Sequence, residues 1–541
     1  MVLRRVDSRI ASHASQLRTV ERGNARPQAS IAPWEYWAAS TIAVSARILF
    51  WAITRREFED ALITIAHAQN GASGLGLVHH VGELEPVHGF TSALSVLIPL
   101  VGEIAHAGIG LTTMRVVSVL AGALTVVIAL GLCRELGVTR GPRWLIVLYV
   151  ALNSNHIFYG MAGMETQVAV MLLLASILTV VHRRPAWQIG TLLGMTILAR
   201  PDFILWAGFV LLFATFESRS EAAKVSVWAT AVLAPWLAFT VYYYGSPIPN
   251  TITAKSQVWG ALSVLLEPDG IRKFIGEMTG AIERLQYTFA PFFDNSLVIR
   301  APIPRFAAIV VSLVVMTFAF RGAIELSKNR RWWPVIAFAG TYTIYRIAAL
   351  PDYYFDWYLP PYTAVVVLLA GKGLDVVDFS PAVRRGAAVA ISTLLILPFA
   401  WTLGLEQKVE VEIDRGVRRP LAWFLDEGAE QESVVAESAG FIGYYSDVLL
   451  WDFPGLTSDT SRTALAAMEN PTMQALIEEL RPQWIVLRPF ELEQLEASHG
   501  GTASEYRLVR EFGGNPTGVV RFGGLELATI DERFGVYELS G

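Results

Sequence analysis

Two adjacent carboxylates, Glu59 and Asp60, stand in the stretch "FEDALITIAHAQN" (58–70), directly after a long apolar run. A carboxylate at the boundary of an apolar segment costs free energy unless it is solvated or functional. Such a group can accept the proton of an attacking hydroxyl, which is general base catalysis. The alternative is purely structural, because acidic residues also stabilise the N-terminus of a helix.

The spacing of this stretch predicts an amphipathic helix at the membrane surface. An apolar stripe begins at Phe58, whereas Asp60 and His67 lie seven residues apart on roughly the opposite side. We therefore expect Asp60 and His67 to face one cavity. Glu59 should point about a hundred degrees away from Asp60.

Other polar residues stand in turn-like motifs further along the chain. They are Glu165 in "GMAGMETQ" (160–167), Arg200 and Asp202 in "LARPDF" (198–203), Asn250 and Lys255 in "YYYGSPIPNTITAK" (242–255), and Asp356 in "PDYYFDWYLPP" (351–361). Taken singly, each motif is explained by Gly and Pro turns and by charged side chains at span ends. Taken together, they place acids, an amide and cations at or near the outer ends of predicted spans.

Membrane spans must position these residues. The chain has 541 residues, 53% of them hydrophobic and 17% charged, with a mean hydropathy of +0.43, which predicts a polytopic α-helical membrane protein. The single Cys133 rules out an intrachain disulfide. Three histidines in one Gly-rich loop, His79, His80 and His88, are a weak metal signal, so we predict no metal and no cofactor. The net charge of -5 argues against a nucleic-acid partner.

Apolar runs and the positive-inside rule predict the topology. Residues 1–33 form a basic cytoplasmic tail, and residues 34–403 hold about eleven spans. The predicted spans are 34–53, 113–132, 144–160, 166–181, 187–200, 203–217, 225–243, 305–320, 332–349, 361–376 and 385–403. The short run 91–108 is expected to be interfacial or re-entrant.

The polar loops then fall on the outer face. The long loop 54–112 carries the acidic pair. From residue 404 to 541 the composition becomes that of a soluble protein, and strand-like and helix-like runs alternate. We predict a small extracytoplasmic α/β domain there.

The ordered motifs "FEDALITIAHAQN", "GELEPVHGFTS" (82–92), "GMET", "RPD", "YYGSPIPNTITAK" and "DWYLPP" resemble bacterial glycosyltransferases of the GT-C superfamily. More narrowly, they are similar to the group of the mycobacterial terminal β-arabinofuranosyltransferase. The resemblance runs over roughly the first 360 residues. It implies a polyprenyl-phosphate-linked sugar donor, a glycan or lipid-linked acceptor, and a location in the bacterial inner membrane.

The resemblance also implies a catalytic carboxylate in the first outer loop. Family members commonly have Asp-Asp where this chain has Glu59 and Asp60, so the essential role passes to Asp60. Inverting single displacement needs one such base. Glu59 is the second expected catalytic residue, which orients Asp60 or binds the acceptor or donor sugar. The expected substrate-binding residues are His67, Glu165, Arg200, Asp202, Asn250, Lys255 and Asp356. Arg55 and Arg56 are favoured as interfacial anchors. The alternative function is a secondary transporter or channel in which Asp60 binds a cation or proton.

Overall fold

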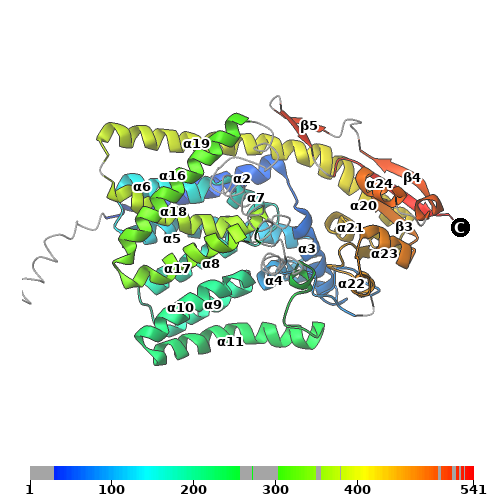
Figure 1. Ribbon diagram of the computed structural model, residues 1–541, viewed down its shortest axis with the longest axis horizontal. Coiled ribbons are helices and arrows are strands. Elements are labelled where there is room, and N and C mark those ends of the chain that lie inside the picture. The colour runs from blue at the N-terminus through cyan, green and yellow to red at the C-terminus, as the bar shows by residue number, and fades with distance from the viewer. Residues whose placement is uncertain are drawn as a thin grey trace, which may run out of the picture.

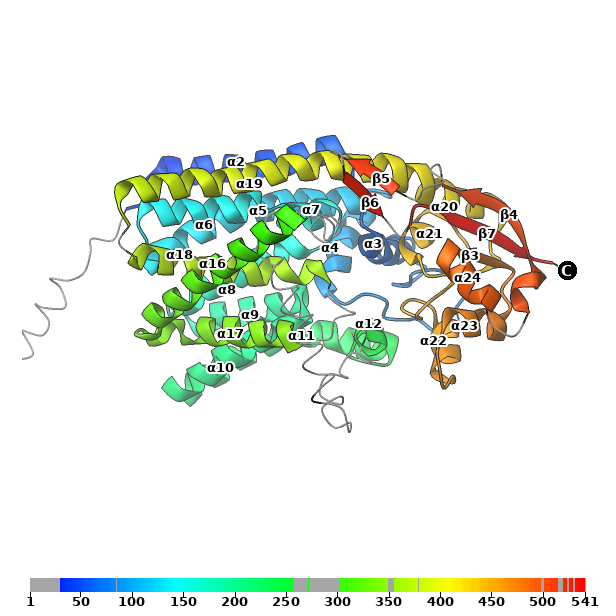
Figure 2. The same cartoon turned by 45° about the horizontal axis from the view of Figure 1, so that its top comes forward.

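The computed structural model describes residues 30–541 except 84, 256–270, 272–301, 349–354, 378, 498–500, 514–518, 523–524, 529–530 and 541. A bundle of long helices forms one end of the molecule, and a smaller unit with strands forms the other (Figure 1). Helix α3 (Glu59–Ala72) lies between the two, also after the molecule is turned (Figure 2). The acidic pair thus stands at the junction of two parts of the chain.

The helical part follows the apolar pattern of the sequence. Its other helices are α2 (Pro33–Thr54), α4 (Ala93–Ala105), α5 (Gly110–Leu136), α6 (Arg140–Leu152), α7 (Ser154–Met161), α8 (Thr166–Val181), α9 (Ala186–Ala199), α10 (Ile204–Glu217), α11 (Arg219–Tyr244), α12 (Asn250–Lys255), α16 (Pro302–Ser327), α17 (Trp333–Ala348), α18 (Leu359–Val376) and α19 (Pro381–Val409). Within the described residues, five segments are long and apolar enough to cross a membrane. These segments are α2, α5, α11, Ala308–Ser327 and Asp356–Val376. The chain is a multi-pass membrane protein, whereas the count of eleven spans stays a prediction.

The structure adds detail to two predicted segments. The run predicted as one span at 144–160 is two helices, α6 and α7, which meet at Asn153. The Asn153 side chain accepts a hydrogen bond from the backbone N–H of His156 (3.1 Å) and so starts a new helix. The run at 91–108 forms the short helix α4. The Glu103 carboxylate at its end accepts from the N–H groups of Gly108 and Gly110, at 2.6 and 2.8 Å, which caps the start of α5.

A buried arginine stabilises the break between α6 and α7. Arg47 of α2 is 1% exposed and donates to the carbonyl oxygens of Ala43 (2.9 Å) and Ala151 (3.1 Å) and to the side-chain oxygen of Gln167 (2.5 Å). Ala151 lies in the last turn of α6, where carbonyl groups lack helical partners. Arg47 stands inside the first predicted span, and no role was predicted for it. Its neutral partners indicate that it satisfies backbone groups at the break.

The C-terminal unit is a mixed α/β fold. Its helices are α20 (Arg419–Gly428), α21 (Ala439–Tyr445), α22 (Asp459–Ala466), α23 (Met473–Leu480) and α24 (Pro489–Ala497), and its strands are β1 (Ser433–Ala436), β2 (Leu449–Asp452), β3 (Trp484–Leu487), β4 (Tyr506–Phe512), β5 (Val519–Phe522), β6 (Leu525–Ala528) and β7 (Phe534–Leu539). The main sheet has the order β2-β1-β3-β7-β4. Strand β1 runs parallel to β2 and β3, and β7 runs antiparallel to β3 and β4. The predicted C-terminal α/β fold is confirmed.

One helical arm joins the two parts. Helix α19 continues through a π-helical segment, η6 (Glu410–Arg418), into α20 (Figure 1). Helix α3 packs on both parts as well. Its Ile63 belongs to the hydrophobic core of the α/β unit, and its Ala61 packs with Tyr159 and Met164 of the bundle. The orientation of α3 therefore depends on both neighbours.

Candidate functional site

Arg200 is the centre of a polar cluster at the end of the bundle that faces the α/β unit. It follows α9 and precedes the short 3-10 turn η1 (Pro201–Phe203). Its guanidinium lies 3.1 Å from the Asp202 carboxylate and 3.8 Å from that of Glu165. It donates to the carbonyl oxygen of Trp357 (3.1 Å) and lies over the Tyr358 ring at 3.9 Å. Motifs far apart in the sequence thus meet at one guanidinium.

Asp60 belongs to the electrostatic environment of this cluster. It is half-buried in the first turn of α3. Burial raises the pKa of the Glu165 carboxyl, Arg200 opposes that shift, and the negative charges of Asp202 and Asp60 add to it. Burial lowers the pKa of Arg200, but Asp202 and Glu165 among its neighbours more than compensate, so that pKa lies above its usual value. The cluster therefore combines one fixed cation with three neighbouring carboxyl groups.

Aromatic side chains fix the start of α3 against this cluster. The Phe58 ring, directly before α3, meets the rings of Tyr159 and Trp357 edge to face, both at 5.5 Å. Trp357 and Asp356 belong to the 3-10 turn η5 (Asp356–Tyr358). Asp356 thus lies in the same turn whose carbonyl group Arg200 binds. The predicted residues Asp60, Glu165, Arg200, Asp202 and Asp356 come from segments that meet here.

Glu59 faces the α/β unit. Its Oε1 accepts hydrogen bonds from the Ser438 hydroxyl (3.2 Å) and from the backbone N–H groups of Gly440 (2.6 Å) and Phe441 (3.3 Å). Burial raises the pKa of Glu59 to about 7, and the nearby Arg418 opposes the shift. The two adjacent acids therefore have different surroundings. The role of Glu59 beside Asp60 stays a prediction, and its contacts connect it to the α/β unit.

His67 lies two helical turns beyond Asp60, about 10 Å along the helix axis. It is fully buried, donates from Nδ1 to the carbonyl oxygen of Ile63 (2.8 Å), and packs against the rings of Phe90 (5.0 Å) and His79 (5.6 Å). Burial lowers its pKa to about 4, so it is neutral at pH 7. These contacts belong to the packing of α3 and not to the Arg200 cluster.

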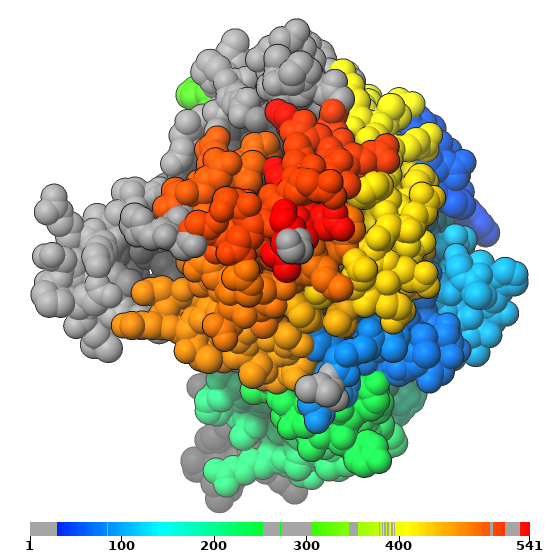
Figure 3. Space-filling view, turned by 90° about the vertical axis from the view of Figure 1, so that its right-hand side faces the viewer, coloured from blue at the N-terminus to red at the C-terminus, as the bar shows by residue number. Residues whose placement is uncertain are grey.

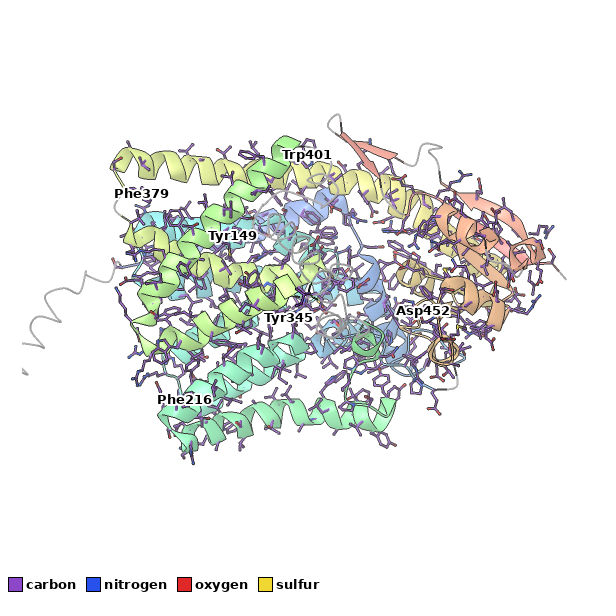
Figure 4. The ribbon with its side chains drawn as sticks, in the orientation of Figure 1. Tyr149, Phe216, Tyr345, Phe379, Trp401 and Asp452 are labelled. Carbon is purple, nitrogen blue, oxygen red and sulfur yellow. The ribbon has the colours of Figure 1, made fainter. Side chains whose placement is uncertain are left out.

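Asn250 and Lys255 begin and end α12. The Asn250 side chain donates to the carbonyl oxygens of Gly455 (2.8 Å) and Leu456 (3.1 Å) in the α/β unit. The carboxylate of Asp452, labelled in Figure 4, accepts hydrogen bonds from several backbone N–H groups of this same loop. Asn250 therefore joins the two parts of the chain. The Lys255 side chain lies outside the described residues.

Two acids that the sequence did not single out also join the two parts. The Glu57 carboxylate forms an ion pair with Arg419 (2.9 Å) and accepts a hydrogen bond from the Tyr445 hydroxyl (2.7 Å). Glu83 accepts from the N–H (3.1 Å) and hydroxyl (2.8 Å) of Thr460. Glu57 directly precedes the quoted acidic stretch and Glu83 lies in "GELEPVHGFTS", so both stood in or beside recognised motifs. Their partners, however, are more than 350 residues away in the chain.

Arg56 forms ion pairs with two carboxylates, in contrast to its expected role as an interfacial anchor. Its guanidinium binds Glu406 (2.7 Å) and the buried Asp414. Arg55 lies over the Trp51 ring at 5.3 Å and stays exposed. In the described part of the chain, no group of three His, Cys, Asp or Glu side chains is placed to hold a metal ion.

A helical membrane part, an α/β unit at one end and a polar cluster beside their junction define a GT-C-like fold. A family model described as "Domain of unknown function (DUF8728)" matches residues 406–537. The sequence matches no curated protein.

Solved structures agree with this fold. ArnT from Cupriavidus metallidurans, bound to undecaprenyl phosphate, superposes with a TM-score of 0.56 at 11% identity, over 94% of this chain and 98% of that chain. The Archaeoglobus fulgidus oligosaccharyltransferase superposes with a TM-score of 0.54 at 13% identity, over 84% and 69%. Arabinofuranosyltransferase AftD from Mycobacteria reaches only 0.40 at 13% identity, over 95% and 40%, so the narrower resemblance is not shown.

Proposed function

We propose that this protein is a membrane glycosyltransferase that moves a sugar from a polyprenyl-phosphate donor to a glycan or lipid-linked acceptor of the bacterial cell envelope. The supporting observation is the cluster of Asp60, Glu165, Arg200 and Asp202 at one end of a GT-C-like bundle. ArnT, which has the same fold, was solved with undecaprenyl phosphate. In this proposal the cluster and the α/β unit lie on the outer face of the inner membrane.

Asp60 is the general base in the proposed reaction. The acceptor hydroxyl gives its proton to the Asp60 carboxylate while its oxygen attacks the anomeric carbon. The bond between that carbon and the phosphate oxygen breaks, and the phosphate leaves with the electron pair and without a proton. One displacement inverts the anomeric configuration, and no second carboxylate is needed as a nucleophile.

The cations and aromatic rings around Asp60 suit the donor. Arg200 is fixed by Glu165 and Asp202, so it offers a preorganised positive charge to the leaving phosphate, with Lys255 as the second proposed cation. Trp357 supplies an aromatic face for a sugar ring, and Asp356 supplies an acceptor for its hydroxyl groups. In this proposal His67 and Asn250, both predicted to bind substrate, have a structural role instead, since their contacts connect elements of the fold. The transferred sugar in this proposal is a pentose, such as arabinofuranose, or a hexose.

Radiolabelled polyprenyl-phosphate pentoses and hexoses, offered to the purified protein in liposomes with a cell-envelope acceptor, test this proposal. We expect the wild-type protein to transfer sugar from at least one donor, and Asp60→Asn to fold normally and transfer almost none. Glu217→Gln, which removes an exposed carboxylate paired with Arg183, is the matched control and should keep full activity. Undiminished transfer by Asp60→Asn would refute the proposed mechanism. Proton or ion flux that depends on Asp60, without transfer from any donor, would favour the transporter alternative.

A further inference from the structure

The junction between the membrane bundle and the α/β unit is densely bonded on the side of α3. In Figure 3 the α/β unit, in orange and red, lies directly against the blue N-terminal segment. Glu57, Glu59, Glu83 and Asn250 each bind groups in that unit. Of these four residues, Glu59 alone is the immediate chain neighbour of the proposed base.

The contact of Glu59 with α21 is unusually close. A Cβ atom added at Gly440 would lie 2.1 Å from the carbonyl oxygen of Glu59 and 3.1 Å from its Cα. The backbones of the two helices therefore touch, and any side chain at Gly440 would push them apart. The same Gly440 donates its N–H to the Glu59 carboxylate at 2.6 Å. The close backbone packing and the side-chain hydrogen bond between α3 and α21 therefore both involve Glu59 and Gly440.

The bundle holds the first turn of α3 from the other side. The Phe58 ring packs against Tyr159 and Trp357, and Ala61 packs beside Met164. The α/β unit contacts another face of α3, through Glu59 and Ile63. The rotation of α3 about its axis is consequently set by contacts with both parts.

A small rotation of α3 matters for Asp60. A side-chain carboxylate lies about 5 to 6 Å from the axis of its helix, so a rotation of about 10° moves it by about 1 Å. A misplacement of about 1 Å at a reacting group costs on the order of 100-fold in rate. The contact that fixes this rotation is therefore expected to control the rate.

We infer that Glu59 is a positioning residue: it ties α21 to the first turn of α3 and so directs Asp60 toward the Arg200 cluster. This inference rests on the proposed function, because Asp60 is the group that it positions. It assigns the α/β unit a part in catalysis without contact with substrate. It also explains why the two neighbouring acids differ, since a positioning role needs a hydrogen-bond acceptor and a base needs a titratable carboxylate.

Substitutions at Glu59 separate these two roles. Glu59→Gln keeps an oxygen acceptor for the N–H groups of Gly440 and Phe441, whereas Glu59→Ala removes it. We expect Glu59→Gln to keep kcat within about threefold of wild type, and Glu59→Ala to lower kcat by about 10- to 100-fold with little change in KM. Gly440→Ala should lower kcat in the same way from the opposite side of the contact.

Hydrogen exchange of the peptide 438–445 gives a readout that does not depend on transfer. We expect this peptide to lose protection in Glu59→Ala and in Gly440→Ala, and to keep it in Glu59→Gln and Asp60→Asn. If Glu59→Gln is as inactive as Asp60→Asn while its exchange is normal, Glu59 is a second catalytic acid and the inference is overturned. Wild-type kcat in Glu59→Ala would also overturn it. If wild-type protein transfers no sugar but the exchange pattern is as expected, the proposed function fails and the junction contact stands.

Discussion

The strength of the junction between α3 and the α/β unit should fall as the pH rises. Glu59 is half-buried there with its Oε2 atom shielded from water, and its pKa is raised to about 7 from an ordinary value of 4.5. The other charges that act on it are Arg418, which lowers this pKa, and Asp531 and Glu437, which raise it. Because the docked state binds the proton more tightly than the open state, protonation favours docking.

The direction and size of this pH effect on docking follow from the pKa of Glu59 in the open and the docked state. The contribution of Glu59 to docking is complete below about pH 4.5 and is lost as the pH rises through about 7. Each pH unit between these values changes the free energy of docking by about 1.4 kcal/mol. The whole interval amounts to about 3 kcal/mol, or a few hundredfold in the equilibrium between docked and open states.

Hydrogen exchange of the peptide 438–445 between pH 5 and pH 8, corrected for the intrinsic exchange rate, measures this equilibrium. We expect wild-type protection to fall steeply over this range. Glu59→Gln cannot titrate and should remove most of the slope, whereas the exposed control Glu217→Gln should leave it unchanged. Equal slopes in wild type and Glu59→Gln would refute the link between the junction and this carboxyl group.

Three further outcomes follow from single contacts. Asn250→Ala removes an amide that donates to two loop carbonyl groups, and should weaken the attachment of that loop by about 1 to 3 kcal/mol, seen as faster hydrogen exchange of residues 453–458. Gly443→Ala would place a Cβ atom 2.0 Å from the His79 ring and should lower the thermal unfolding midpoint, whereas Gly428→Ala meets nothing within 4 Å and should not. Arg200→Lys keeps the charge but loses the planar fork that binds two carboxylates and a carbonyl group, so transfer should fall at least about tenfold; unchanged kcat/KM would contradict the role of Arg200.

Local periodicity predicted the individual helices well. The first span, predicted at 34–53, is α2 (Pro33–Thr54), and the amphipathic stretch after it is α3. Helix boundaries of this kind can be predicted because they depend on the spacing of apolar residues within one or two helical turns. The break at Asn153 was missed, because the group that compensates for it is Arg47, more than 100 residues earlier in the chain.

The site was predicted in part for the same reason. Helical geometry showed that Glu59 and Asp60 point in different directions, but it could not show that the first faces Ser438, 379 residues further along the chain. The motifs marked Glu165 and Arg200 as special, and the fold brings them together. They also marked Asn250, whose partners are carbonyl groups of the α/β unit. Sequence motifs identify unusual residues, whereas partners come only from tertiary structure.

A single-turnover experiment with donor bound to saturation shows directly whether Asp60 acts as the general base. The rate of sugar transfer in Asp60→Asn is compared with that in wild type, while donor affinity is measured separately. We expect a loss of about 100-fold or more in the rate, because the acceptor hydroxyl loses its base, with donor affinity nearly unchanged. A transfer rate equal to that of wild type at saturating donor would contradict the assignment of Asp60 as the base.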